Sequence, residues 1–456
     1  MHIIEQSLLD NLHCYADKTI YVAYSGGVDS QALLFGLSRL KQQQLITNQI
    51  IACHIHHGLS KNADSWQQFC QQQAVQLGVE FITARVDIDI ESKSSLEALA
   101  REARYQSIQS LTPASSIILT GHHLDDQTET FLLALKRGAG VAGLSAMKSS
   151  TMLFERQVVR PLLDVSRKTI ELYASSYELE FIDDESNIDE NFDRNFIRHS
   201  VIPVISERWP SFTKTVARTA HNCQQTQILL DDLASKDLET IESTDESLSV
   251  EPLLSLSKER FNNLVIYFLK RRFGTTPSSS QLEQIKQQML SPLDRMPEIV
   301  LGDVVVRRFK QTLYFTKHFQ DISDWRWSSH RDDAFADTHL ITLPDNLGEV
   351  GIGLSVTPQN NAALHQVRPP NSNQQVSIRF SHNNPKCHPE NRAHRTSLKK
   401  VLKELNIAPW QRKRVPFVYY DEALVAVLGH FVCKEFKPDE NSTKLTINYS
   451  FSQDSR

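Results

Sequence analysis

A short glycine-containing segment near the N-terminus, residues 25–30, lies between an apolar run typical of a strand (residues 19–24) and a run typical of a helix (residues 31–40). Two adjacent glycines let the backbone turn tightly and approach a ligand closely. Backbone N–H groups at the start of a helix attract phosphate oxygens through hydrogen bonds and the helix dipole. The sequence therefore predicts a strand, a pyrophosphate-binding loop and a helix. The residues of this candidate ATP-binding loop are Ser25, Gly26, Gly27, Val28, Asp29 and Ser30.

The carboxylate in this loop indicates a metal. Asp29 would repel neighbouring phosphates unless Mg²⁺ bridged the two or the acid had a proton to transfer. We therefore expect nucleotide chemistry and take Asp29 as the candidate Mg²⁺ ligand. The alternative is an ordinary strand-to-helix turn, because Gly-Gly turns near Ser and Asp are common.

Strand-like and helix-like runs alternate through the first half of the chain. Further apolar runs at residues 50–55, 79–82 and 117–120 are typical of buried parallel strands, and amphipathic helices are predicted between them. This alternation predicts an α/β fold with a doubly wound parallel sheet, which binds its ligand at the carboxyl ends of the strands. The glycine pair and His122 both fall at such ends.

A second polar segment follows the strand predicted at residues 117–120. His122 lies just before a predicted helix, and Asp126 and Glu129 are three residues apart, so the two acids share a face near its start. Such acids can hold a cation and a nucleotide together. They can also be simple partners of the helix dipole.

Two further sets of residues allow alternative interpretations. Arg101 and Arg104 are spaced by three on a predicted helix and could clamp phosphates, or Arg101 could pair with Glu97. His54 and His56 could point to the same side of a strand and share a metal, but no cysteine pair or His-Glu-x-x-His motif supports a zinc site.

Composition limits the class of protein. A chain of 456 residues favours two or three domains, and 23% charged with 40% hydrophobic residues is typical of a soluble globular protein. The N-terminus has no signal-peptide pattern, and no segment is long and apolar enough to span a membrane. Six scattered cysteines without a Cys-x-x-Cys pair indicate a reduced, cytoplasmic protein.

The rest of the chain divides into less distinctive parts. Helices are predicted after residue 167, and the acidic, Ser- and Thr-rich stretch at residues 239–249 is typical of a solvated linker. We expect a first domain at residues 1–215 that carries the candidate ATP-binding loop, a mostly helical middle domain at 216–335, and a small, basic α+β C-terminal domain at 340–456.

One basic region, and one polar stretch that carries two arginines, are candidates for nucleic-acid binding. Between Lys386 and Arg414 there are nine cations and two acids, although the whole chain has a net charge of −5. Trp410 and His394 lie among them, as suits phosphate contact combined with stacking; the alternative is a merely solvated face. The polar stretch 183–199 could also be a capped helix start. The candidate nucleic-acid-binding residues are Arg194, Arg198, Arg395, Lys399, Lys400, Arg412 and Arg414.

Together these segments resemble the tRNA(Ile)-lysidine synthetase family, a branch of the N-type ATP pyrophosphatases, whose catalytic fold is a Rossmann-like PP-loop domain. The resemblance is dense over about the first 210 residues, good over the last 70 and only general between them. The matching segments are residues 25–30, 54–60, 97–105, 121–147, 160–163, 184–199 and 395–427. The segment 54–58 departs slightly from a frequent family form, so we assign it no catalytic role.

The resemblance implies a ligase that forms a carbon–nitrogen bond. It would use ATP and Mg²⁺ to join free L-lysine to C2 of the wobble cytidine of the CAU-anticodon isoleucine tRNA, through an adenylated cytidine, releasing AMP and pyrophosphate. The lysidine formed changes the codon read from AUG to AUA. The enzyme would act as a monomer or homodimer. The implied catalytic residues are Asp29, Arg101, Arg104, His122, Asp126 and Glu129.

Three rival functions share part of this pattern. A tRNA thiolation enzyme would need reactive cysteines or an iron–sulfur cluster, and no Cys-x-x-Cys is present. A small-molecule adenylating synthetase would leave the basic C-terminal region unexplained. A non-catalytic tRNA-binding protein would have no need for Asp29, Asp126 and Glu129 around an ATP site.

Overall fold

The computed structural model describes most of the chain, in two compact units, Met1–Leu233 and Ala234–Arg456. Arg101 and Arg104, with most of the helix predicted around them, lie outside the described residues. Among the described residues, no helix has the length and apolar character needed to cross a membrane. The described ranges are 1–56, 58, 60–86, 103, 106–153, 155–244, 246–292, 298–330, 338–354, 362–439 and 442–451.

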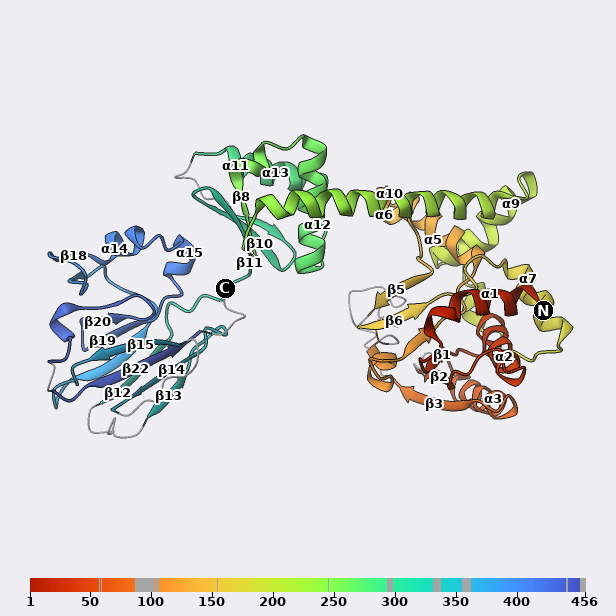
Figure 1. The fold of residues 1–456 in the computed structure, drawn as a ribbon, viewed down its shortest axis with the longest axis horizontal. Helices are drawn as coiled ribbons and strands as arrows, with labels where there is room; N and C mark the ends of the chain where they lie inside the picture. The colour runs from red at the N-terminus through yellow and green to blue at the C-terminus, as the bar shows by residue number, and fades with distance from the viewer. Residues whose placement is uncertain are drawn as a thin grey trace. The chain divides into compact units, whose positions relative to one another are not determined.

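A six-stranded sheet forms the centre of the first unit (Figure 1). Its strand order is β3-β2-β1-β4-β6-β5, and every neighbouring pair is parallel except β5 with β6. The predicted doubly wound parallel sheet is therefore confirmed, with one antiparallel edge strand. The strands are β1 (Ile20–Ala23), β2 (Ile50–His56), β3 (Glu80–Arg85), β4 (Ile117–Leu119), β5 (Ser150–Leu153) and β6 (Arg156–Val159).

Alternate residues of the parallel strands face two separate cores. Ile20 and Val22 of β1 belong to the larger core, whereas Tyr21 belongs to the smaller one on the other face. Burial on both faces explains why these strands read as continuous apolar runs. Four helices contribute to the larger core, α1 (Ile3–Leu12), α2 (Val28–Gln42), α3 (Ala63–Gln76) and α7 (Arg167–Ser176).

The remaining helices of the first unit follow β4 and α7. One of the helical stretches after residue 167, residues 193–208, consists of three consecutive segments, with a π-helical turn, η3, in the middle. Helix α10 follows, and the boundary between the two units falls inside it. The bounds are α5 (Leu124–Lys136), α6 (Val141–Leu144), α8 (Asp193–Phe196), η3 (Ile197–Val201), α9 (Ile202–Arg208) and α10 (Phe212–Ile241).

The middle region combines helices with an antiparallel sheet of order β7-β8-β11-β10-β9. The expectation of a solvated linker at residues 239–249 is wrong, because β8 pairs with β11 and buries Ser247 and Leu248. The bounds are α11 (Val250–Leu254), α12 (Lys258–Phe273), α13 (Ser279–Leu290), β7 (Glu242–Thr244), β8 (Ser247–Ser249), β9 (Ile299–Leu301), β10 (Val304–Phe309) and β11 (Thr312–Lys317).

The C-terminal region places one hydrophobic core among antiparallel strands and short helices, so the α+β prediction is confirmed. The larger sheet has β12 (Arg326–His330), β16 (Gln375–Arg379), β19 (Phe417–Tyr420), β20 (Ala423–Val427) and β21 (Phe431–Val432). The smaller one has β13 (His339–Thr342), β14 (Glu349–Gly353), β15 (Ala362–Val367) and β22 (Leu445–Ser450). Beside them lie β17 (Lys386–Cys387), β18 (Thr396–Ser397), α14 (Leu398–Glu404) and α15 (Pro409–Arg412).

Candidate active site

The glycine loop lies where the sequence predicts it, between the end of β1 and the start of α2. Gly26 has a φ of +84°, and a Cβ there would lie 2.5 Å from Cδ1 of Ile182 and 2.8 Å from Sγ of Cys70. The backbone N–H of Ile182 also donates to the carbonyl of Gly26 at 2.9 Å. Both the positive φ and the lack of room for a Cβ therefore require glycine at this position.

Replacing Gly26 by alanine should distort the loop. We expect Gly26→Ala to lower the free energy of unfolding by about 1–3 kcal/mol, because the new methyl group meets Ile182 at a strained positive φ. Chemical denaturation measures the loss, and ATP binding should weaken with it. Gly78→Ala is a matched control, since Gly78 also has a positive φ (+66°) but has open space around its Cβ position. Equal losses in the two variants would show that packing against Ile182 is unimportant.

A second glycine brings the loop after β4 against the first turn of α2. A Cβ on Gly121 would lie 3.0–3.1 Å from backbone atoms of Asp29 and Ser30. Within the first loop, the hydroxyl of Ser30 donates to the carbonyl of Gly27 at 3.0 Å, and the hydroxyl oxygens of Ser25 and Ser30 lie 3.2 Å apart. The two polar segments predicted from sequence thus meet at the carboxyl ends of β1 and β4.

One carboxylate oxygen of Asp29 accepts a hydrogen bond and the other does not. Its Oδ2 accepts from Nη1 of Arg167 at 2.5 Å. Its Oδ1 is buried, lies 3.6 Å from Nε2 of His123, and has no hydrogen-bond partner among the described residues. Burial raises the pKa of Asp29, and the nearby His123 and Arg167 oppose that shift. A carboxylate oxygen that accepts no hydrogen bond suits Mg²⁺, which takes one or two protein carboxylates together with phosphate oxygens and water.

His123 is a site residue that the sequence reasoning missed. Its buried ring lies at the start of α5, with Nε2 3.6 Å from Asp29 and 3.4 Å from Asp126, and Nδ1 3.6 Å from Asp125. Burial lowers the pKa of His123, but the three carboxylates outweigh it and the net pKa is raised. His122, the predicted residue, is half-buried, and its Nδ1 lies 2.7 Å from Oγ1 of Thr120.

Two arginines form ion pairs with the two acids of α5, Asp126 and Glu129. Arg194 donates from Nε to Oε2 of Glu129 at 2.6 Å and from Nη2 to Oδ1 of Asp126 at 2.9 Å. Arg198 donates from Nε to Oε1 of Glu129 at 2.6 Å. Glu129 is 0% exposed. Burial would raise the pKa of Asp126, but His123 and Arg194 lower it to about 2. The site therefore holds the carboxyl groups of Asp126 and Glu129 between two arginine side chains.

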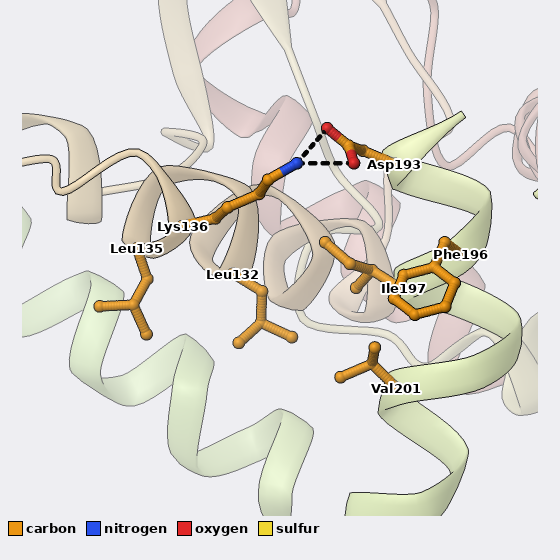
Figure 2. Close-up of a pocket in the computed structure, with 7 residues that line it drawn as sticks. All are labelled: Leu132, Leu135, Lys136, Asp193, Phe196, Ile197 and Val201. Atoms are coloured by element: carbon orange, nitrogen blue, oxygen red, sulfur yellow. Dashed lines mark hydrogen bonds and ion pairs between the residues drawn. The ribbon is translucent and has the colours of Figure 1, made fainter. Parts of the chain in front are cut away.

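An apolar groove continues along the same two helical segments, α5 and α8–η3 (Figure 2). It encloses about 350 Å³ and contains no residue of the glycine loop. The Lys136 ammonium reaches across it to both carboxylate oxygens of Asp193, at 2.6 and 2.7 Å. Its lining residues are Leu132, Leu135, Lys136, Asp193, Phe196, Ile197 and Val201.

The two histidines of β2, His54 and His56, have other partners. Nδ1 of His54 lies 2.9 Å from the carbonyl oxygen of Tyr24, and Nε2 of His56 lies 3.2 Å from Oδ1 of Asp64. Across the described part of the chain, no group of three or more His, Cys, Asp or Glu side chains could hold a metal by itself. Any Mg²⁺ at Asp29 would therefore need ligands from the nucleotide and water.

The candidate tRNA-binding residues of the C-terminal region fall into two groups. Lys399 and Lys400 lie exposed on α14, and neither forms an ion pair with a described residue. Arg395 is exposed but donates to Oε1 of Glu435 at 2.6 Å. The Nε of Arg412 donates to the carbonyl of Ile407 at 2.8 Å, and burial lowers the pKa of this half-buried side chain.

Two residues of the basic segment are mainly occupied within the protein. Arg414 is only 8% exposed, pairs with Asp345 and lies over the ring of Phe319 at 4.2 Å. The Trp410 ring packs edge-on against Phe309 and Tyr314, at centroid distances of 6.2 and 5.5 Å. The Trp410 contacts join α15 to the β10–β11 hairpin. Arg414 therefore has little surface left for a nucleic acid, whereas Trp410 is half-buried.

Comparison with known proteins gives the family. Residues 1–205 match the PP-loop domain, 248–314 the TilS substrate binding domain, and 376–449 the TilS substrate C-terminal domain. The tRNA(Ile)-lysidine synthase of Serratia proteamaculans is 41% identical over 435 residues, covering 95% of this chain and 96% of that protein. That of Edwardsiella ictaluri is 38% identical, covering 95% of each chain. The similarity extends along nearly the whole chain, and the protein belongs to the tRNA(Ile)-lysidine synthase family.

Proposed function

We propose that this protein ligates free L-lysine to C2 of the wobble cytidine in the CAU-anticodon isoleucine tRNA, at the expense of ATP. The observation that carries the proposal is the convergence of the glycine loop with Asp29, Asp126 and Glu129, in a chain similar along its length to tRNA(Ile)-lysidine synthases. Lysidine in the anticodon would make the tRNA read AUA in place of AUG.

The chemistry explains why an ATP site is needed. C2 of cytosine is a urea-like carbonyl carbon and a poor electrophile, so its oxygen must first become a leaving group. Adenylation achieves this and releases pyrophosphate; the lysine amine then displaces AMP. The N–H groups of the glycine loop are suited to hold the departing pyrophosphate. Mg²⁺, when bound, would neutralise part of its charge, with Asp29 as the protein ligand.

The other residues take roles that follow from their surroundings. We propose that Asp126 and Glu129 bind the lysine ammonium or the nucleotide, with Arg194 and Arg198 fixing their orientation. The side chains of those arginines are 23% and 33% exposed, so tRNA or nucleotide can reach part of each side chain. His122, Arg101 and Arg104 stay proposed contacts of the activated base or the phosphates.

The domain division also remains a proposal. We place the catalytic domain at residues 1–215, the middle domain at 216–335 and the C-terminal domain at 340–456. Each of the three family matches falls within one of these parts. We propose that the two later domains hold the tRNA, and that the enzyme acts in the cytoplasm as a monomer or homodimer.

A direct assay tests the reaction. Purified protein is incubated with ATP, Mg²⁺, isotope-labelled lysine and unmodified CAU-anticodon isoleucine tRNA, and the digested tRNA is examined by mass spectrometry. We expect a lysine–cytidine adduct at the wobble position. No adduct from a folded protein that binds ATP would overturn the proposal and favour a thiolation enzyme or a small-molecule synthetase.

The exposed cations of α14 should contribute to tRNA affinity. We expect the double variant Lys399→Gln/Lys400→Gln to weaken tRNA binding several-fold and to reduce the slope of log K against log salt by about two, one for each phosphate that a lysine no longer neutralises. ATP binding should not change. Filter binding at several salt concentrations measures both quantities. The control is Lys437→Gln, because Glu390 already balances that ammonium at 2.8 Å; an equal effect there would argue against a specific role for α14.

A further inference from the structure

The geometry points to Arg167 as a positioning residue that holds Asp29 ready for the metal-bound phosphates of ATP. Neither the loop motif nor the acidic motif contains this arginine, which begins α7. The inference rests on the proposed use of ATP and Mg²⁺ at the glycine loop. It assigns to Arg167 no contact with the reacting atoms.

The backbone of residue 167 is fixed independently of its side chain. Its N–H donates to Oδ2 of Asp125 at 2.8 Å, and the N–H of Leu124 donates to the carbonyl of Val165 at 2.9 Å. These bonds tie the start of α7 to the start of α5. Because they use main-chain donors of residues 124 and 167, a substitution of the Arg167 side chain leaves both in place.

The guanidinium is held from two sides. Its Nη1 donates to Oδ2 of Asp29 at 2.5 Å, and its Nε donates to Oε1 of Glu171, one turn further along α7, at 2.8 Å. A planar guanidinium that uses two of its donors in this way has a fixed orientation. The charge-assisted bond to Asp29 therefore restricts the rotation of that carboxylate.

The consequence is that the two oxygens of Asp29 differ. Oδ2 is taken by Arg167, while Oδ1 is buried and without a hydrogen bond to any described residue. A buried carboxylate oxygen that lacks a hydrogen bond is costly, and a cation brought in by the nucleotide would stabilise it further than the His123 ring, whose Nε2 lies 3.6 Å away. Without Arg167 the carboxylate could turn, and Oδ1 would no longer be presented in one direction.

Nucleotide binding without tRNA or lysine tests this role. Calorimetry would compare wild type with Arg167→Gln, once with ATP and Mg²⁺ and once with ATP and EDTA. We expect the variant to bind Mg²⁺-ATP about tenfold more weakly, which is the usual scale for a lost hydrogen bond to a charged group. Affinity in EDTA should be unchanged. Arg167→Lys should recover part of the loss, because it keeps the charge.

Two further variants separate positioning of Asp29 from direct phosphate binding and from a purely structural role. Lys168→Gln removes the same charge from the exposed neighbouring position and should leave both affinities unchanged. In an Asp29→Asn background, Arg167→Gln should cause no further loss. An equal loss with and without Mg²⁺ would show direct phosphate contact instead and overturn the inference. So would a lowered melting temperature with normal Mg²⁺ dependence. If the wild type formed no lysidine, the proposed function would be refuted. The binding results would still test the role of Arg167, because they need neither tRNA nor lysine.

Discussion

Asp29→Asn should lower the rate of ATP-dependent tRNA modification by about a hundredfold to a thousandfold, the usual scale for removing one group that stabilises developing charge. The carboxylate stands at the first turn of α2, and its Oδ1, which is buried and has no hydrogen bond among the described residues, is the oxygen that we propose for Mg²⁺. Asparagine keeps the shape but not the charge. Single-turnover formation of the lysine–cytidine adduct measures the effect.

Stability must be followed in the same variant. Burial raises the pKa of Asp29, so its charge is held there at a cost, and Asn should leave the protein as stable as the wild type or slightly more stable. A fall in activity with unchanged or increased stability would separate the catalytic role from folding. Asp164→Asn is the control, because Asp164 is an exposed acid that lies before α7. Activity within a few-fold of wild type for Asp29→Asn would refute the metal role.

The fold of the first unit could be predicted because its strands are buried on both faces. Four apolar runs with amphipathic segments between them allow few arrangements other than a parallel sheet. The hairpin of β5 and β6 was not predicted. These strands have four residues each, and the exposed Met152 and half-buried Arg156 and Gln157 break the apolar pattern.

The site residues could be predicted only where they stand close together in the sequence. Asp29, Asp126 and Glu129 stand in short motifs beside predicted strand ends. Arg167 pairs with Asp29 across 138 positions of sequence, and no local pattern marks such a contact. Of two adjacent histidines, His123 starts α5 and points among the carboxylates, which the motif alone does not reveal.

Charge counting in the C-terminal region overstated the free positive charge for a similar reason. The segment 386–414 contains nine cations and two acids. Folding brings Glu435 to Arg395 and Asp345 to Arg414, from 40 and 69 positions away. Among the described residues, the positive charges without an acidic partner include the lysines of α14. We therefore expect that helix to contribute more of the tRNA affinity than the arginines around it.

The second large effect concerns the buried carboxylate of the site. Glu129→Gln should lower the free energy of unfolding by about 3 kcal/mol, because it leaves Arg194 and Arg198 without the anion that both Nε groups contact at 2.6 Å. The amide fills the same space, so the loss reflects charge and not a cavity. Urea denaturation at neutral pH measures it.

Asp193→Asn provides the contrast for Glu129→Gln. Asp193 lies on the same helical segment as Arg194 and pairs with Lys136, but both partners are exposed, so the expected loss is below about 1 kcal/mol. A Glu129→Gln loss as small as this would mean that solvent replaces the buried acid easily. If the loss is large, adduct formation should also fail at temperatures where the variant is fully folded. Arg194 and Arg198 would then hold only Asp126, and the pair proposed to bind the lysine ammonium or the nucleotide would have lost the carboxylate of Glu129.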